Sequence, residues 1–291
     1  MTCTKEVIID SDAGFCFGVV SAINIAEKEL KQFGKVYCLG DIVHNEEEVS
    51  RLSSLGLKVI THNDFEHLSG KRVFIRAHGE PPATYKRAKE NNITIIDATC
   101  PIVLKLQEKV NAGYLEMQQK SGQVVIFGGK KHPEVIGLSG QTDDTAIVVG
   151  CKDDLSSIDY SKPVRLYSQT TKNKEEYSEI ISEIEKRLPS NNKDFIAYNT
   201  TCGRVANRTK QLNDFTKQVD VIVFVSGKKS SNGMYLYNHC KQIFDNTHWV
   251  SEKSELQAEW FKNTEKIGIT GATSTPMWLM EDIKMYIENN F

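Results

Sequence analysis

Three cysteines occupy the same kind of position in this chain and could act together as ligands. Cys16, Cys100 and Cys202 each follow a short apolar run and a polar turn, and each precedes a segment with helical periodicity. A thiol at the carboxyl end of a strand and beside a helix amino terminus lies where the thiolate form is stabilised. The positions are about a hundred residues apart, which is too long for a solenoid repeat and predicts three α/β units.

Other polar residues end strands at equivalent places in the three predicted units. One group ends the first strand after each cysteine, and a second group ends a later strand. The first group is His44, His132 and Ser230, and the second is His78, Thr170 and Ser274. Because ligands bind outside the carboxyl ends of the strands in open parallel sheets, we expect these side chains to face one polar cavity with the three thiolates at its base.

These polar strand ends suit an anionic ligand. Ser230, Ser231 and Asn232 supply hydroxyl and amide donors at an expected helix start, which favours phosphate oxygens. The three histidines add donors that can carry charge near neutral pH. Lysines at positions 130, 131, 228 and 229 flank two of the strand ends and would steer an anion toward them.

Glu134 is the candidate proton donor, because it lies two residues from His132 and follows a proline. A carboxyl group enclosed in a pocket can have its pKa raised toward the working pH, and Thr170 would orient its proton. Taken alone, a glutamate in such a position is more often a surface carboxylate.

Three thiolates converging on one point would hold a metal ion or a cluster. Zinc takes four closed ligands or three plus water, whereas cubane [4Fe–4S] clusters are held by thiolates, usually four. A cubane held by three cysteines leaves one iron open to bind a substrate oxygen as a Lewis acid and to deliver electrons. The C-x₂-C spacing of ferredoxins and zinc ribbons is absent. The repeated position is therefore the only indication, and three unrelated buried thiols remain the alternative.

The composition is that of a globular chain of two or three domains. It has 291 residues, 25% of them charged, and a net charge of −2, which gives no indication of a nucleic-acid partner. No apolar run approaches the roughly 18 residues that span a bilayer, so no membrane partner is expected. The amino-terminal residues lack a signal-peptide core, so the cytoplasm is the expected compartment. Since thiols are reduced there, the seven scattered cysteines are not expected to form a disulfide framework.

We expect an α/β fold of three similar units with small, mainly parallel sheets. The predicted boundaries are residues 14–98, 99–197 and 198–291, with an N-terminal strand within residues 1–13 joining the third unit. P-loop, G-x-G-x-x-G, H-E-x-x-H and G-x-S-x-G motifs are absent. A bound nicotinamide or flavin on a Rossmann turn is therefore not indicated, and any electrons would come from outside the chain.

Together these motifs resemble one family, the 4-hydroxy-3-methylbut-2-enyl diphosphate reductases (the IspH or LytB family). The matching segments run in the family's order through nearly the whole chain. They are residues 14–19 (GFCFGV), 43–45 (VHN), 77–79 (AHG), 97–101 (DATCP), 132–135 (HPEV), 169–171 (QTT), 230–232 (SSN) and 272–276 (ATSTP).

The resemblance implies a cofactor, a substrate and a role for each candidate residue. Three α/β units would lie in a pseudo-threefold arrangement around one central [4Fe–4S] cluster per chain, held by Cys16, Cys100 and Cys202. The substrate hydroxyl would bind the open iron, and Glu134 matches the family's proton donor, with Thr170 beside it. Residues that match the diphosphate ligands are His44, His78, His132, Ser230, Ser231, Asn232 and Ser274.

The implied reaction is the last step of the non-mevalonate isoprenoid pathway. Two electrons from ferredoxin or flavodoxin and two protons would remove the hydroxyl of (E)-4-hydroxy-3-methylbut-2-enyl diphosphate as water. The products would be isopentenyl and dimethylallyl diphosphate.

Three features depart from the family's pattern, one of them being the pair Glu80 and Pro81 that follows His78. Ala206 stands where relatives often have Thr, which leaves the role of that hydroxyl open. The acidic run Glu46–Glu48 follows His44, and since acidic groups would repel a diphosphate, we interpret this run as a solvated helix face.

Two alternatives of other classes remain open on the residues alone. A zinc hydrolase of a phosphorylated small molecule could use the same three thiolates, but it would contain zinc and be colourless. A non-catalytic redox-sensing cluster protein would need neither the three histidines nor the Ser-Ser-Asn segment, and it would bind no diphosphate.

Overall fold

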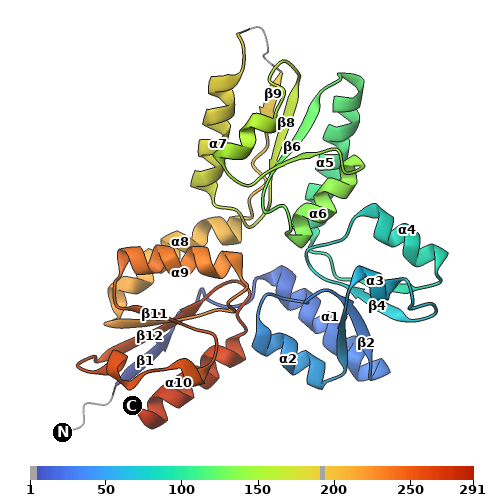
Figure 1. Ribbon diagram of the computed structural model, residues 1–291. Coiled ribbons are helices and arrows are strands. Elements are labelled where there is room, and N and C mark those ends of the chain that lie inside the picture. Colours follow the sequence, from blue (N-terminus) through green and yellow to red (C-terminus); the bar gives the residue numbers. More distant parts are fainter. Residues whose placement is uncertain (1–4, 191–193) are drawn as a thin grey trace. The chain divides into compact units, whose positions relative to one another are not determined.

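A computed structural model (Figure 1) describes residues 5–190 and 194–291. Within these residues the strands form three four-stranded parallel sheets, each flanked by helices. The α/β class with three small parallel sheets is therefore confirmed. Residues 1–4, the beginning of the segment 1–13 in which an N-terminal strand is expected, lie outside the described residues.

One sheet has the strand order β1-β12-β10-β11. Its strands are β1 (Glu6–Ile9), β10 (Val221–Val225), β11 (Thr247–Val250) and β12 (Lys266–Gly271), and its helices are α8 (Gly203–Phe215), α9 (Ser231–Ile243) and α10 (Met277–Asn290). The run Val-Ile-Val-Phe-Val of β10 is buried throughout, as expected for a strand covered on both faces. Leu279, Ile283 and Ile287 of α10 pack on one face, and Leu212 of α8 and Leu236 of α9 pack on the other.

A second sheet has the order β3-β2-β4-β5. Its strands are β2 (Val36–Leu39), β3 (Leu57–Ile60), β4 (Arg72–Ile75) and β5 (Thr94–Asp97). Along the chain they alternate with the helices α1 (Phe17–Phe33), α2 (Glu46–Ser54), α3 (His62–Phe65) and α4 (Pro82–Glu90). Helix α1 ends at Gly34, which adopts the left-handed conformation (φ 69°) that glycine tolerates best.

The third sheet has the order β7-β6-β8-β9. Its strands are β6 (Gln123–Phe127), β7 (Ile147–Val149), β8 (Val164–Ser168) and β9 (Phe195–Ala197), and its helices are α5 (Pro101–Gln119), α6 (Pro133–Ser139) and α7 (Lys174–Arg187). Tyr177, Ile180 and Ile184 of α7 pack on one face, and Leu106 and Val110 of α5 pack on the other. Short 3₁₀ helices lie at Gly140–Thr142, Lys152–Ser157, Thr216–Gln218, Lys253–Glu255 and Ala258–Phe261.

Parallel pairing brings the carboxyl ends of neighbouring strands to one edge of each sheet. The last paired residues include Ile9 with Ile269, Ile75 with Asp97, and Leu166 with Ala197. The loops that carry the predicted site residues follow these ends, so each sheet gathers its own loops on one side.

The chain forms two compact units. The first comprises the residues up to Val36, Asp41–Val59 and Asn207–Phe291, and the second comprises Tyr37–Gly40 and Ile60–Ala206. The boundaries at residues 14–98, 99–197 and 198–291 remain a prediction.

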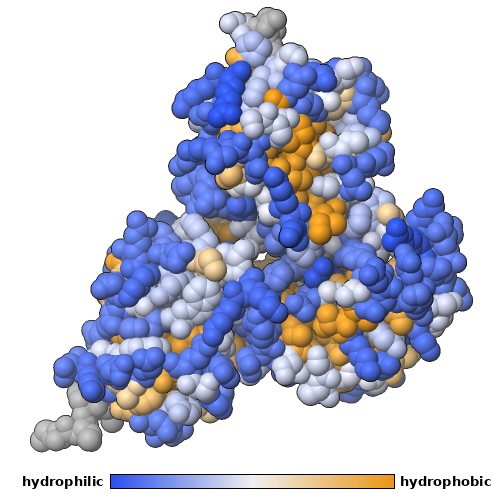
Figure 2. All heavy atoms as spheres, viewed as in Figure 1, coloured by the Kyte–Doolittle hydropathy of each residue, from blue (hydrophilic) through white to orange (hydrophobic). Residues whose placement is uncertain are grey.

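The surface shown in Figure 2 is mainly hydrophilic, with apolar residues exposed in a few areas, one of them over the part that contains β6. No helix in the described part of the chain combines the length and the apolar composition needed to cross a bilayer.

Candidate active site

Each of the three cysteines lies where an edge strand has ended and a helix begins. Cys16 and Cys100 cap the amino termini of α1 and α5, and Cys202 directly precedes α8. All three are half-buried. Each cysteine N–H donates to a carbonyl that follows the neighbouring strand, and the pairs are Cys16 with Thr273 (3.2 Å), Cys100 with Ala77 (3.0 Å) and Cys202 with Thr170 (2.8 Å). The repeat predicted from the sequence is therefore also a repeat of backbone geometry.

Cys100 and Cys202 are presented by the same short turn. In both, an Asp or Asn three residues before the cysteine accepts a hydrogen bond from the threonine directly before the cysteine. The pairs are Asp97 with the Thr99 N–H (2.9 Å) and hydroxyl (2.5 Å), and Asn199 with the Thr201 hydroxyl (3.0 Å). Such side-chain bonds set the direction of the chain without strand pairing.

In the second compact unit, Glu134 and Thr170 form a closed pair. Glu134 is 1% exposed, and its carboxylate accepts hydrogen bonds from the Thr170 N–H (2.6 Å) and the Thr170 hydroxyl (2.7 Å). The Thr170 carbonyl accepts the N–H of Cys202. The candidate proton donor is thus two hydrogen bonds away from the backbone of a candidate metal ligand.

Burial raises the pKa of Glu134 from 4.5 to about 7, because the ionised carboxylate loses its hydration. The two hydrogen bonds from Thr170 act in the opposite direction, since they stabilise the charged form. A carboxyl group with this pKa is partly protonated at neutral pH, as a general acid must be.

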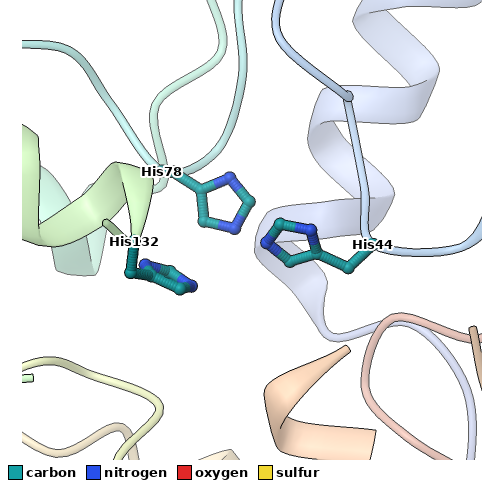
Figure 3. A group of neighbouring side chains, drawn as sticks. All are labelled: His44, His78 and His132. Atoms are coloured by element: carbon teal, nitrogen blue, oxygen red, sulfur yellow. The ribbon is translucent and has the colours of Figure 1, made fainter. Parts of the chain in front are cut away.

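Two of the predicted histidines lie beside this pair. Figure 3 shows the rings of His78, which follows β4, and His132, which caps α6; their centroids are 5.3 Å apart in an edge-to-face arrangement. The Nδ1 atom of His132 accepts the N–H of Glu134 (3.2 Å). The neutral ring therefore carries its proton on Nε2, from which it can donate to an anion.

In the first compact unit, the loop after β12 joins three of the predicted residues. The hydroxyl groups of Ser230 and Ser274 lie 3.1 Å apart, and Ser230 also accepts the N–H of Gly233 as the amino-terminal cap of α9. The Asn232 amide donates to the hydroxyl of Thr273 (3.1 Å), the residue whose carbonyl holds Cys16.

Asn232 has spare hydrogen-bonding capacity in this loop cluster. Its Oδ1 atom is buried and has no hydrogen-bond partner among the described residues. A buried polar atom of this kind calls for a ligand or a water, and rotation of the amide would present its NH₂ group instead. Ser231 is exposed, one residue into α9.

His44 belongs to the first compact unit, in the turn between β2 and α2, and Figure 3 also labels it. The backbone of Gly227, after β10, approaches this turn so closely that a Cβ atom on it would lie 2.6 Å from the His44 carbonyl oxygen and 2.9 Å from the Asn45 Cα. Only glycine fits there without a backbone shift. An open cavity of about 250 Å³ is lined by His44, Asn45 and Lys229, and also by the acidic residues Asp41 and Glu46. Lys229 is exposed, as a cation that steers an anion must be.

The interpretation of Glu46–Glu48 as a solvated face is wrong for Glu48. Glu46 is exposed, but Glu48 is 1% exposed and binds the Arg51 guanidinium and the Trp278 indole N–H (2.7 Å). Its charge is neutralised by Arg51, so a buried carboxylate in this helix does not oppose an anion site nearby.

The structure thus joins the predicted residues within each compact unit. In the second unit, contacts run from His78 through His132, Glu134 and Thr170 to Cys202, and Cys100 is bonded to the carbonyl of Ala77, which precedes His78. In the first unit, Cys16, Ser230, Asn232 and Ser274 surround one loop. Sequence reasoning missed the contacts of Thr273 and Gly227 and the burial of Arg208, which is 1% exposed. Arg208 had a signal, since it stands on the otherwise apolar face of α8 with Leu212 and Phe215.

The family model of the LytB protein matches residues 7–288. The chain belongs to the LytB protein family. Among the curated relatives of this LytB chain, the 4-hydroxy-3-methylbut-2-enyl diphosphate reductase of Bacteroides fragilis (strain ATCC 25285) is 48% identical over 283 residues, which cover 97% of both chains. That of Chloroherpeton thalassium is 44% identical and covers 98% of this chain and 97% of its own.

Solved structures agree with this LytB assignment. One is a structure of (E)-4-hydroxy-3-methyl-but-2-enyl diphosphate reductase, the terminal enzyme of the non-mevalonate pathway. It is 36% identical to this chain, covers 98% of this chain and 99% of its own, and superposes with a TM-score of 0.74. Another, of the E-1-hydroxy-2-methyl-but-2-enyl-4-diphosphate reductase from Plasmodium falciparum, is 26% identical, covers 99% and 89%, and gives a TM-score of 0.84.

Proposed function

We propose that this chain reduces (E)-4-hydroxy-3-methylbut-2-enyl diphosphate to isopentenyl and dimethylallyl diphosphate and water, with ferredoxin or flavodoxin as the electron donor, in the cytoplasm. The names of the relatives support the substrate. The observation that carries the proposal is the buried Glu134–Thr170 pair, bonded through the Thr170 carbonyl to the backbone of Cys202. This arrangement suits protonation of a leaving group beside a metal ligand.

The three cysteines fit a [4Fe–4S] cluster by the chemistry and placement of their thiols. Each is half-buried, each stands at a helix amino terminus, and each has its backbone held by a neighbouring strand end. Cys16, Cys100 and Cys202 would hold one cluster per chain. When bound, the cluster would supply the electrons and a Lewis-acid iron.

The polar strand ends would bind the diphosphate. In the second compact unit the Nε2–H of His132 and the ring of His78 would donate to phosphate oxygens, and in the first unit the turn of His44 would do so. The hydroxyl groups of Ser230, Ser231 and Ser274 and the amide of Asn232 would add neutral donors. Fixing the charged end of the ligand would hold its reacting end in one orientation.

Glu134 would supply the proton that turns the departing hydroxide into water. Its raised pKa keeps the acid form populated near neutral pH, and the Thr170 hydroxyl keeps the carboxyl group in one orientation. After transfer, the carboxylate would be stabilised by the same two hydrogen bonds until it is reprotonated.

The decisive experiment is anaerobic turnover of the hydroxylated allylic diphosphate with a reduced artificial one-electron donor. We expect both allylic and homoallylic diphosphate products, together with iron, acid-labile sulfide and brown colour in the purified chain. Colourless protein that contains zinc and hydrolyses phosphate esters would contradict the proposal. So would a coloured protein that binds no inorganic diphosphate.

A further inference from the structure

A buried arginine lies behind the loop that carries Cys16. Arg208, on α8, is 1% exposed, and its Nη2 atom donates to the Asp10 carboxylate (2.5 Å) and to the Thr270 hydroxyl (2.6 Å). The Thr270 hydroxyl in turn donates to the same Asp10 oxygen (2.7 Å). The three side chains therefore form a closed triangle between α8, β12 and the residue that follows β1.

Asp10 begins the loop that leads to Cys16. Its second carboxylate oxygen accepts the N–H of Asp12 (3.0 Å), and its carbonyl accepts the N–H of Ala13 (3.0 Å). One turn further along α8, the Gln211 amide donates to the Asp12 carboxylate (2.8 Å). One face of α8 thus holds the start of this loop at two points.

The end of the loop is held by β12. Thr270 belongs to the triangle, and three residues later the carbonyl of Thr273 accepts the N–H of Cys16 (3.2 Å). Arg208 therefore contacts both segments that lead to the cysteine, Asp10 at the start of its loop and Thr270 in the strand that continues to Thr273.

A buried charge pair of this kind is poorly explained by stability alone. The Nε and Nη1 atoms of Arg208 are buried without a hydrogen-bond partner among the described residues, and unsatisfied buried donors are costly. Arg165 provides the contrast. It is equally buried, yet its three nitrogens are bonded to Glu116, to Asp194 and to the Val164 carbonyl.

We propose that Arg208 is a positioning residue for Cys16, which it acts on through Asp10 and Thr270. This rests on the proposed function only in treating Cys16 as a metal ligand. An arginine suits the task because one terminal nitrogen can donate to a carboxylate and to a hydroxyl group at once, and a lysine would supply the charge without the planar geometry.

The test uses the full-length chain with two changes at the triangle. The double variant Asp10→Asn, Arg208→Met removes both charges, so no unpaired charge is left to unfold the protein, and Asn keeps an acceptor for the Asp12 N–H. The variant Arg208→Lys keeps the charge but not the geometry. Arg165→Met is the matched control, because it removes an equally buried arginine from a different sheet.

Two readouts, both followed by mass spectrometry, measure how firmly the loop is held. One is the hydrogen exchange of residues 10–16, and the other is the rate of Cys16 alkylation by iodoacetamide. In the double variant we expect at least tenfold faster exchange of this segment and at least fivefold faster alkylation of Cys16 relative to Cys100, with a smaller change in Arg208→Lys. In the double variant, hydrogen exchange of β6 should match wild type. In Arg165→Met, both the exchange of residues 10–16 and the alkylation of Cys16 should match wild type. Equal exchange and alkylation in wild type and the double variant would overturn the proposal.

Iron and sulfide contents of the same variants separate this proposal from the proposed function. Faster exchange with reduced iron supports both. Faster exchange with unchanged iron supports the positioning role, whereas wild-type protein that holds no iron contradicts the proposed function whatever the exchange rates.

Discussion

The carboxylate of Glu134 receives two hydrogen bonds from a single residue, Thr170, one from the backbone N–H (2.6 Å) and one from the hydroxyl (2.7 Å). The pair sits in a site where the glutamate is 1% exposed. The backbone bond cannot be removed by substituting Thr170, except by proline, but the hydroxyl bond can. The two contributions are therefore separable by mutation.

Glu134→Gln should lower turnover by roughly 100-fold or more, because a primary amide has nearly the same shape but no acidic proton. Iron content and affinity for inorganic diphosphate should stay at the wild-type level, since neither the cysteines nor the histidines change. Single-turnover kinetics with a chemical reductant measures the loss. A turnover within about threefold of wild type would exclude Glu134 as the proton donor.

The same variant should show a pH-dependent gain in stability. In wild type the folded carboxyl has a pKa of about 7 against 4.5 unfolded, so the unfolded state ionises first as the pH rises. Below pH 4.5 the difference in unfolding free energy between wild type and Glu134→Gln should therefore not change with pH. As the pH rises toward 7, wild type should lose stability relative to the variant, by about 3 kcal/mol in all. Urea unfolding at pH 5 and pH 8 measures the gap, and a constant gap would contradict the raised pKa.

Thr170→Val should move the pH dependence of turnover upward. The hydroxyl bond stabilises the ionised form of Glu134, so its loss raises the pKa of the carboxyl group further, and the decline in rate at high pH should shift by roughly half to one unit. The maximal rate should also fall, because the carboxyl group loses an orienting bond. Thr170→Ser, which keeps the hydroxyl, should retain the wild-type profile, and an identical profile for all three proteins would contradict this role.

Cys100→Ser should remove most of the iron, the sulfide and the visible absorption. Loss of a thiolate ligand is expected to weaken metal binding by at least about 100-fold, more than loss of a supporting group does. The fold should survive because serine is a favourable cap for the amino terminus of α5. The exposed Cys151→Ser is the control and should keep a full complement of iron. Full iron content in Cys100→Ser would exclude it as a ligand.

Gly227→Ala should weaken binding of inorganic diphosphate by about tenfold. The new methyl group would lie 2.6 Å from the His44 carbonyl oxygen, so the His44 turn and the loop that leads to Ser230 must separate. Gly150→Ala is the matched control, since its nearest neighbours would lie at 3.4 and 3.6 Å. Isothermal titration of each full-length variant measures the affinity, and equal affinities would contradict a role for this close approach.

Much of the fold and several site residues followed from local patterns in the sequence. Short β-branched runs such as Val221–Val225 predict buried parallel strands, because an unbroken apolar run can be recognised from a few neighbouring residues. The equivalent positions of Cys16, Cys100 and Cys202 predicted one helix start and one strand end for each, and the structure has both at each cysteine. The residue types at the strand ends already indicated an anion site.

The tertiary structure alone decided the ionisation and the support of these residues. The pKa of Glu134 depends on how completely the surrounding segments exclude water, which no spacing along the chain encodes. The same is true of Glu48, which the sequence suggested to be solvated and the fold buries against Trp278, and of Arg208, which meets Asp10 nearly two hundred positions earlier. Sequence periodicity reports which face of an element turns inward; only the packed structure determines which groups meet there and whether water remains.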